Sequence, residues 1–497
     1  MICDADVTRP RLCVTVTAAT TADLRRQRDL VADADLIELR LDSVKDPSVA
    51  GALAGRRRPV IVTCRPAWEG GEFRGPEEER RRLLGEALTL GAEYVDIEWH
   101  AHFDDLISRV GGRRIVLSMH DYRSMPGDLR ETARTMRATG AEVIKIAATA
   151  HCLRDCLPLL DLGAAQGKQG EMVLIAMGEP GLASRVLAGR FESSWTYAGS
   201  VSRVGQLSVA EMLEEYRFRS VTESTDVYGV VGSPVAHSVS PAMHNAAFRA
   251  ARLDAVYLPL QASDADDFMA FAHAIGLKGA SVTIPFKVAL FERVDEAYAV
   301  ARRIGAINTI RIVNGRSLGG NTDASGFLRP LQARSLLVPG LRVAILGAGG
   351  AARAVAIALA SSGAEIRVHA RDRGRAEQVA MIVSAQAGPW PPEPGSWDLL
   401  VNCTPMGMHP HTEETPVAAD ALSGRLVYDL IYNPRTTRLL REAAAAGCQT
   451  IGGLDMLVAQ AHEQFQWWTD ARPPDGVMRA AAVRRLAESS TDENHVV

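Results

Sequence analysis

Eight short runs rich in apolar and β-branched residues alternate with helix-like segments over the first 217 residues, and this alternation constrains the fold more than any other feature. The intervening segments, such as 76–91 and 127–140, have helical composition, so the strands are most simply parallel and joined by crossover helices. The expected strands occupy residues 12–16, 35–42, 59–65, 93–99, 114–121, 142–148, 171–178 and 193–198. Eight such units predict a (β/α)8 barrel, a fold that typically takes ~250 residues.

The rest of the chain reads as a second α/β region. Residues 220–226 carry Ser and Thr without apolar periodicity and predict a short linker. Strand and helix patterns resume after it, and residues 341–373 give a strand, a Gly-rich turn, a helix and another strand. That order is typical of a dinucleotide-binding unit. The end of the chain, 489–497, has little apolar content and is expected to be disordered.

Composition places the chain among ordinary soluble globular proteins. Its 497 residues are about three times a typical domain, so two or three folding units are expected. With 47% hydrophobic and 23% charged residues and a net charge of -4, it shows no bias toward nucleic acid or anionic membranes. The start of the sequence is acidic and no apolar run approaches ~18 residues, so we expect no targeting segment and no membrane span.

The seven cysteines predict a reducing compartment and no metal site. They are odd in number, scattered and without paired CxxC spacing, which favours free thiols and a cytoplasmic location. Cys152 and Cys156 follow His151, but both would fall on one face of an apolar helix. Buried structural thiols are the better interpretation there and at Cys403, and we predict no metal.

Lys145 is the first candidate for chemistry in the barrel. It lies in an apolar run with Val143, Ile144 and Ile146, and a buried lysine is costly unless the amine becomes neutral or pairs with an opposite charge. A neutral amine would be a nucleophile. The alternative, a lysine leaning out of the strand end, is weakened because polar side chains end several other expected strands. These are Glu38, Arg40, Arg65, Glu98 and His120, and in a barrel such positions converge at the carboxyl-terminal mouth.

The motifs ELRLD, TCRPAWEGGEF, SMHDY, IKIA, AMGEPGLASR and SRVGQLSV make the first half resemble type I 3-dehydroquinate dehydratases over residues 11–219. The resemblance implies that Lys145 forms an imine with the substrate's 3-keto group, that His120 shuttles the proton and that Glu69 orients it. It assigns the substrate's carboxylate and hydroxyls to Glu38, Arg40, Arg65, Arg185, Ser202 and Gln206. A lysine and a histidine suit this chemistry. The iminium carbon formed by the lysine accepts electrons from the neighbouring C–H bond, and an imidazole can move that proton near neutral pH.

The second half resembles shikimate dehydrogenases over residues 227 to about 488, through GVVGSPVAHSVSP, GASVTIPFK, GAINTI, GGNTDASGF, DLIYNP and GGLDMLVAQA. The resemblance implies a catalytic pair, Lys287 with Asp323, which could supply a proton to the alkoxide formed by hydride transfer. A structural salt bridge is the alternative for that pair outside these motifs. Asp323 also belongs to the implied substrate contacts, with Ser238, Ser240, Thr283, Asn308, Thr309, Tyr432 and Gln460.

The Gly-rich turn follows the apolar strand VAIL and precedes an alanine-rich helix, as pyrophosphate binding at a helix N-terminus requires. The expected cofactor contacts are Gly347, Ala348, Gly349, Gly350, Ala351 and Gly453. Arg371 and Arg375 stand where the family holds a 2'-phosphate, which favours NADP. Asp372, in the same neighbourhood, could instead accept from a ribose 2'-hydroxyl, as in NAD enzymes.

Together these patterns predict a bifunctional enzyme of the shikimate pathway of aromatic amino acid biosynthesis. The expected domains are a dehydratase barrel (1–219), the linker (220–226), a substrate-binding domain (227–328, completed by helices in 454–488), an NADP-binding Rossmann-like domain (329–453) and the tail. The product of the first reaction, 3-dehydroshikimate, would be the substrate of the second. One alternative is a catalytically silent metabolite sensor, which would be expected to lack Lys145, His120, Lys287 or Asp323, but the chain has all four. The other alternative is an NAD-dependent quinate enzyme, and the resemblance disfavours it because the chain has Ser240 where quinate enzymes are associated with glycine.

Overall fold

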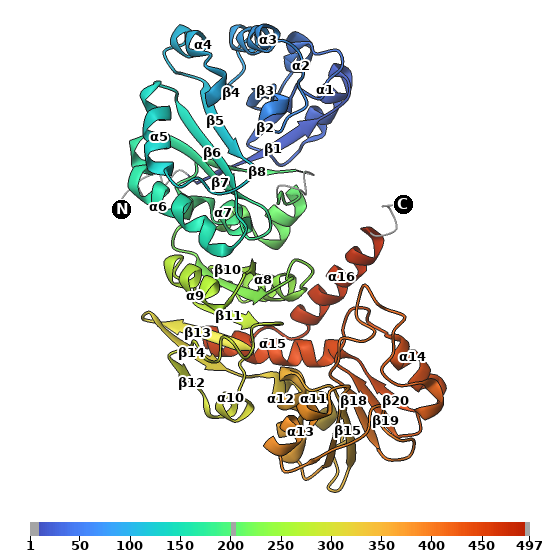
Figure 1. Cartoon of the computed structure of the whole chain (residues 1–497). Helices are drawn as coiled ribbons and strands as arrows, with labels where there is room; N and C mark the ends of the chain where they lie inside the picture. Colours follow the sequence, from blue (N-terminus) through green and yellow to red (C-terminus); the bar gives the residue numbers. More distant parts are fainter. Residues whose placement is uncertain (1–8, 200–204, 493–497) are drawn as a thin grey trace. The chain divides into compact units, whose positions relative to one another are not determined.

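The structure, a computed structural model, describes residues 9–199 and 205–492 of the chain (Figure 1). The chain divides into two compact units, one made of residues 1–226 and 258–275 and the other of residues 227–257 and 276–497. The predicted linker lies at the junction at 226, and the finer domain boundaries stay predictions.

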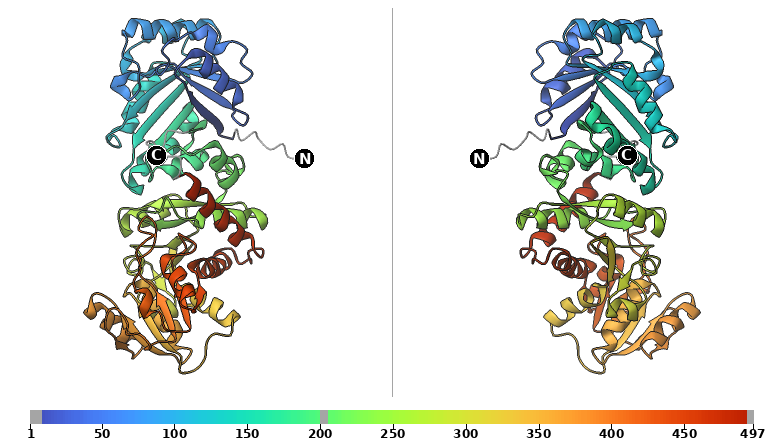
Figure 2. Two further views of the ribbon diagram at one scale, coloured as in Figure 1. Left: turned by 90° about the vertical axis from the view of Figure 1, so that its right-hand side faces the viewer. Right: turned by 90° about the vertical axis from the view of Figure 1, so that its left-hand side faces the viewer.

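The first unit contains a nearly closed barrel of eight parallel strands in the order β7-β6-β5-β4-β3-β2-β1-β8. The strands are β1 (Arg11–Thr17), β2 (Leu36–Arg40), β3 (Val60–Thr63), β4 (Tyr94–Glu98), β5 (Ile115–Asp121), β6 (Val143–Thr149), β7 (Glu171–Met177) and β8 (Trp195–Ala198). Between them lie α1 (Thr21–Leu30), α2 (Val49–Leu53), α3 (Glu77–Thr89), α4 (Asp104–Arg109), α5 (Leu129–Ala138), α6 (Leu157–Gln166) and α7 (Leu182–Val186). All eight predicted strands are confirmed, and the side views show them crossing the middle of this unit with helices outside (Figure 2).

Alternation along each strand decides which side chains enter the barrel. On β6, Val143 and Ala147 belong to the cluster of buried side chains inside the barrel, so Lys145, between them, points inward as well. Ile144 and Ile146 point the other way and are also fully buried. Strands of a barrel wrapped by helices are buried on both faces, which explains why these runs are almost continuously apolar.

The rest of the described chain forms two six-stranded sheets. The first has the order β10-β9-β11-β13-β14-β12 and the second the order β17-β16-β15-β18-β19-β20. The first sheet and its helices are β9 (Asp226–Gly232), α8 (Ser240–Ala250), β10 (Ala255–Gln261), α9 (Ala265–Ala274), β11 (Gly279–Val282), β12 (Glu296–Ala297), α10 (Ala299–Ile304), β13 (Thr309–Val313), β14 (Arg316–Gly320) and α11 (Asp323–Ala333).

The second sheet is parallel throughout and carries the predicted dinucleotide-binding unit. Its elements are β15 (Arg342–Leu346), α12 (Gly350–Ala360), β16 (Glu365–His369), α13 (Arg373–Ile382), β17 (Gln386–Ala387), β18 (Leu399–Asn402), β19 (Leu426–Asp429), α14 (Arg438–Ala445) and β20 (Gln449–Ile451), followed by α15 (Gly453–Thr469) and α16 (Val477–Asp492). One buried cluster joins the sheet to α11, α12 and α13, and a separate cluster joins it to α14, so helices cover both faces (Figure 1).

One sequence prediction needs correction at the end of the chain. Residues 489–492, predicted to be disordered, continue helix α16. The segment has no glycine or proline after Gly476, so nothing in the backbone stops a helix that is already anchored by Met478 and Ala482. Residues 493–497 of the predicted tail lie outside the described residues.

The described part of the chain contains no helix that is both long and apolar enough to cross a membrane. Within residues 9–199 and 205–492, no three His, Cys, Asp or Glu side chains are grouped so that they could hold a metal ion. The described cysteines are free thiols.

Candidate active sites

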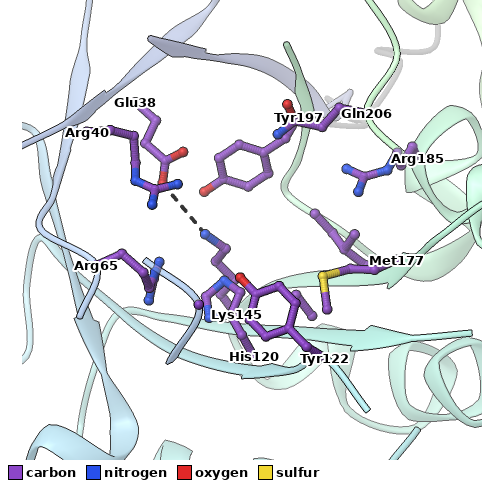
Figure 3. A pocket seen from close by; sticks show the side chains of 13 residues that line it. Glu38, Arg40, Arg65, His120, Tyr122, Lys145, Met177, Arg185, Tyr197 and Gln206 are labelled. Atoms are coloured by element: carbon purple, nitrogen blue, oxygen red, sulfur yellow. Dashed lines mark ion pairs between the residues drawn. The ribbon is translucent and has the colours of Figure 1, made fainter. Parts of the chain in front are cut away.

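A pocket opens inside the barrel, lined by side chains from the carboxyl ends of the strands (Figure 3). Lys145 lies in its wall and is 4% exposed. Predicted residues from five other segments of the chain line it too. They are Glu38, Arg40, Arg65, His120, Arg185 and Gln206. The barrel therefore brings together residues that are up to 168 positions apart in the sequence, from Glu38 to Gln206.

Lys145 is paired rather than isolated. Its Nζ lies 3.0 Å from Oδ2 of Asp96 and 3.8 Å from Oε1 of Glu38. The ring of Tyr197 covers it, with the ring centroid 4.4 Å from Nζ. An amine in such a place is held at one point by charge and by packing, which suits a nucleophile that must meet a carbonyl carbon in one orientation.

Asp96, which the sequence interpretation did not single out, contacts Lys145 together with Ser118 and Arg65. Its side chain is fully buried, accepts a hydrogen bond from Ser118 (Oγ to Oδ1, 2.6 Å) and lies 3.0 Å from Nη2 of Arg65. Burial alone would raise the pKa of Asp96, but the Arg65 and Lys145 cations hold it well below its usual range. The signal was present in the sequence, because Asp96 shares one strand face with Glu98 in YVDIE.

His120 and Glu69 form a second pair in the same pocket. Glu69, in the short helical turn η1 (Ala67–Glu69), has Oε1 2.9 Å from Nδ1 of His120, and the same oxygen accepts from the His120 backbone N–H at 3.0 Å. Burial, with the Arg65 and Lys145 cations, lowers the pKa of His120 well below 6.5, and burial raises the pKa of Glu69 to about 8. A neutral imidazole fixed through Nδ1 is suited to accept a proton at its other nitrogen.

Among the remaining predicted residues of the barrel, Glu38 and Arg40 are hydrogen-bonded in the pocket wall, whereas Glu98 lies outside the pocket lining. Glu38 accepts from Thr15 and Thr63, each at 2.9 Å, and Arg40 is held by Asp42 through two hydrogen bonds of 2.8 and 2.7 Å. Glu98 does not line the pocket; it is fully buried and pairs with Arg65 and Arg80. Ser202 lies outside the described residues.

In the second unit, the predicted catalytic pair is in contact. Nζ of Lys287 donates to Oδ2 of Asp323, the first residue of α11. Asn308 Nδ2 lies 2.7 Å from the other oxygen of that carboxylate and 3.3 Å from Oε1 of Gln460 on α15. Thr322, which the sequence interpretation missed, lies 3.0 Å from Asn308 Nδ2 through its Oγ1. The carboxylate is thus fixed by an amide while it holds the lysine.

The other predicted substrate contacts lie near one edge of the first sheet, with one exception. β9 and β11 run parallel, so the loop carrying Ser238 and the residue Thr283 both follow carboxyl ends of strands. Ser238 Oγ accepts from the backbone N–H of Ser240, 3.2 Å away. Tyr432 is partly buried against the cluster of α8 and α15. Thr309 is the exception: its side chain is fully buried, and the described residues offer its hydroxyl no hydrogen-bond partner.

A buried chain of hydrogen bonds supports Asn308 from behind. The Tyr257 hydroxyl donates to Ser281 (2.6 Å), Ser281 donates to Oε1 of Gln464 (2.6 Å), and Nε2 of Gln464 donates to the Asn308 carbonyl (3.0 Å). The sequence interpretation missed these three residues. Gln464 follows Gln460 by four positions on a helix, a spacing that puts both amides on one face.

The Gly-rich turn fits a dinucleotide pyrophosphate. Gly347 has φ of +107° and lies close to Cys403, and a Cβ at Gly349 would meet nothing within 4 Å. Gly349 is the N-cap of α12 and has no side chain to occupy the first N–H groups of that helix. These groups are therefore available to an anion. Ala348 packs against the core, Ala351 lies in the first turn of α12, and Gly453 is required by close packing, since a Cβ there would lie 2.1 Å from the Leu430 carbonyl oxygen.

At the end of β16, Asp372 is a helix cap. Its carboxylate caps α13 by accepting from the backbone N–H of Arg375 at 3.1 Å. Arg371 and Arg375 are both exposed, whereas Arg373 between them pairs with Glu377. The local structure thus leaves the guanidinium groups of Arg371 and Arg375 exposed. It uses Asp372, the acidic side chain that could accept from a ribose hydroxyl, as the cap of α13.

Comparisons with known proteins agree with this geometry in both units. The type I 3-dehydroquinase family profile matches residues 12–223, and those of the shikimate dehydrogenase substrate-binding and C-terminal domains match residues 230–310 and 453–483. A shikimate dehydrogenase (NADP(+)) of Symbiobacterium thermophilum is 43% identical over 52% of this chain and 94% of its own. The crystal structure of a shikimate dehydrogenase in complex with NADP+ superposes with a TM-score of 0.51 and 36% identity, over 54% of this chain and 97% of that one.

One relative spans both halves. The chloroplastic bifunctional 3-dehydroquinate dehydratase/shikimate dehydrogenase of Arabidopsis thaliana is 35% identical over 89% of this chain and 78% of its own length. A match over 89% of the chain necessarily includes parts of both the barrel and the dehydrogenase region. The chain belongs to the family of bifunctional 3-dehydroquinate dehydratase/shikimate dehydrogenases.

Proposed function

We propose that the barrel pocket dehydrates 3-dehydroquinate to 3-dehydroshikimate and that the Lys287–Asp323 site reduces 3-dehydroshikimate to shikimate. The protein is a shikimate-pathway enzyme with a lyase and an NADP-dependent oxidoreductase activity. The observation that carries the residue assignment is the grouping of a buried lysine, its carboxylate partner and a Glu-oriented histidine in one pocket.

In the dehydratase, the Lys145 amine adds to the 3-keto carbon and water leaves, which gives a protonated imine. Asp96 stabilises the positive nitrogen, because its carboxylate already lies 3.0 Å from Nζ. His120 takes a proton from C2, the electron pair moves to the imine and returns to form the ring double bond as the C1 hydroxyl departs, and His120 gives that hydroxyl its proton. Hydrolysis of the imine releases the product and restores Lys145.

The other groups of the barrel pocket bind and orient the substrate. Glu38, Arg40 and Arg65 stand on one side of Lys145, and Arg185 and Gln206 stand on the other (Figure 3). The Glu38 carboxylate in the pocket wall would repel another carboxylate, so we assign the substrate's carboxylate to the Arg185 and Gln206 side and its ring hydroxyls to the Glu38 side. Ser202 is proposed to join the carboxylate site.

In the dehydrogenase, Lys287 is the proton donor to the substrate oxygen and Asp323 holds the lysine in place. Bound NADPH would supply the hydride. Asn308 fixes the Asp323 carboxylate and is itself held by Gln464, so the pair keeps its geometry while the charge on the substrate oxygen changes. Ser238, Ser240, Thr283, Thr309, Tyr432 and Gln460 are proposed to bind the substrate's carboxylate and hydroxyls.

NADP is the cofactor, and the chain's own residues fit it. The N-terminus of α12 is proposed to receive the pyrophosphate, and Arg371 and Arg375 the 2'-phosphate. We place the protein in the cytoplasm, on the free thiols of its described cysteines; the Arabidopsis relative is chloroplastic.

The residue assignment is tested by trapping the imine. Borohydride added with 3-dehydroquinate should give a stable adduct on Lys145, identified by peptide mass. Lys145→Ala should abolish both the adduct and dehydration while shikimate oxidation with NADP+ persists. Lys168→Ala, which changes a lysine of the same barrel outside the pocket, is the matched control and should behave as the wild type. Full dehydration by Lys145→Ala would end the Schiff-base assignment.

A further inference from the structure

The hydroxyl of Tyr197 is a polar group of the dehydratase pocket that the mechanism above does not use. Tyr197 lies on β8, lines the pocket and is 3% exposed. Its Oη has no hydrogen-bond partner among the described residues, and neither has the indole N–H of Trp195, two positions earlier on the same strand. A buried hydroxyl without a partner costs roughly 1–3 kcal/mol, so a group in the pocket that binds it would recover that cost.

The ring fixes where this hydroxyl can act. Its centroid lies 4.4 Å from Lys145 Nζ, the atom that becomes the imine nitrogen. In Figure 3 the ring reaches across the pocket, with its hydroxyl directed toward the space between Glu38 and Lys145 and away from Arg185. Both carboxylate oxygens of Glu38 already accept from threonines. Because the described residues give the hydroxyl no hydrogen-bond partner, it faces the space that is left for the substrate.

Burial and the nearby Glu38 carboxylate raise the pKa of Tyr197 well above 10. The phenol is thus protonated over the working range of pH and is available as a donor. A neutral donor near the Glu38 carboxylate suits a neutral acceptor on the substrate, since the substrate's carboxylate is assigned to the Arg185 side of the pocket.

We propose that Tyr197 donates a hydrogen bond to the C4 hydroxyl of 3-dehydroquinate, the hydroxyl on the carbon next to the imine carbon, and so selects substrates that carry it. The assignment rests on the proposed dehydratase function. With C3 bonded to Lys145 and the carboxylate on the Arg185 side, the C4 hydroxyl falls within the space that the Tyr197 hydroxyl faces. Tyr197 is then a specificity-determining residue through its hydroxyl. Its aromatic ring packs against Nζ of Lys145, and that contact does not depend on the hydroxyl.

Tyr197→Phe isolates the hydroxyl, because the ring over Lys145 is kept. With 3-dehydroquinate as substrate, we expect the variant's kcat/KM to fall about tenfold or more, since a site built to bind a hydroxyl loses affinity when either partner is removed. Borohydride trapping on Lys145 should persist, and the thermal midpoint should stay the same or rise, because an unpaired buried hydroxyl is removed. Tyr94→Phe is the matched control, a tyrosine of the same barrel that does not line the pocket.

The second arm uses 4-deoxy-3-dehydroquinate as the probe. Wild type and Tyr197→Phe should dehydrate this analogue with equal kcat/KM, because neither complex contains the hydrogen bond. Unchanged kcat/KM of Tyr197→Phe with 3-dehydroquinate, or an equal loss with both substrates, would overturn the proposal. Absence of dehydration and of imine trapping in the wild type would instead overturn the dehydratase assignment itself.

Discussion

Nζ of Lys145 lies 3.0 Å from Oδ2 of Asp96, and both side chains are almost completely buried inside the barrel. Asp96 is also in contact with Arg65, so one carboxylate balances two cations next to the position of the substrate's carbonyl carbon. This arrangement is suited to stabilise an iminium ion, whose positive charge sits where the ammonium charge was.

Asp96→Asn should impair dehydration by about 100-fold or more in kcat, because the neutral amide cannot balance the iminium charge and the next carboxylate, Glu38, lies 3.8 Å from Nζ of Lys145. Reduction of 3-dehydroshikimate by the same variant should be unchanged. Steady-state rates of both half-reactions measure this, with Asp105→Asn, an exposed partner of Arg81, as the control. Normal dehydration by Asp96→Asn would show that the charge of this carboxylate has no part in the reaction.

Lys287→Ala should slow the reduction of 3-dehydroshikimate by about 100-fold or more in kcat while KM changes little, since a proton donor acts chiefly in the transition state. Dehydration should be unaffected. Lys278→Ala, an exposed lysine nine residues earlier, serves as the control. A raised KM with normal kcat would make Lys287 a binding residue only, and loss of both activities would contradict independent sites.

Cofactor preference should follow the two exposed arginines. The wild type should favour NADPH over NADH by at least about tenfold in kcat/KM, or about 1.4 kcal/mol, and Arg371→Ala with Arg375→Ala should remove most of that preference. Asp372→Ala should leave it in place and lower the stability of the dehydrogenase region by about 1 kcal/mol, because this carboxylate caps α13. A preference of the wild type for NADH, or a loss of NADH use in Asp372→Ala, would show that Asp372 reaches the ribose.

His244 should make the dehydrogenase region sensitive to acid. The side chain is fully buried and stacks 4.4 Å from the Tyr257 ring, and the described residues give neither ring nitrogen a hydrogen-bond partner. Burial, with a smaller effect of His462, lowers its pKa to about 3. Because this folded-state pKa lies below the unfolded value of about 6.5, the stability contribution is complete above pH 6.5 and is lost as the pH falls toward 3.

Between pH 6.5 and pH 5 the loss from this one group is about 2 kcal/mol. His244→Phe keeps an aromatic ring in the stack and should flatten that part of the pH dependence, as measured by thermal inactivation of shikimate oxidation at the two pH values. His411→Phe, an exposed histidine, should retain the wild-type slope. An unchanged slope in His244→Phe would mean that protonation of His244 is not what destabilises the protein in acid.

The sequence predicted the elements well where local pattern and fold agree. The eight barrel strands were predictable because strands buried on both faces are almost continuously apolar, and Lys145 and His120 stood out within them as polar exceptions. Asp96 was missed although it shares a strand face with Glu98, and Tyr197 was missed because an aromatic side chain is typical of a strand and does not stand out as a polar group.

Other differences arise from tertiary contacts that no local pattern encodes. Gln464 supports Asn308 across a distance of 156 positions in the sequence, so its role becomes visible only when α15 packs beside the sheet. Thr309 stays a predicted substrate contact, and antiparallel pairing of β13 with β11 and β14 leaves its side chain fully buried beside Asn308. Asp372 was open to two readings because a helix cap and a ribose contact use the same residue type at the same place.

The central claim, that one chain performs both consecutive reactions at two separate sites, is tested most directly by a coupled assay. Pure protein supplied with 3-dehydroquinate and NADPH should consume NADPH, seen as a loss of its absorbance, and form shikimate. Lys145→Ala should be inactive alone, and Lys287→Ala should be slower by about 100-fold or more. An equimolar mixture of the two variants should recover activity, since each supplies the site that the other lacks. No NADPH consumption by the wild type with 3-dehydroquinate, while it still reduces 3-dehydroshikimate, would contradict the account.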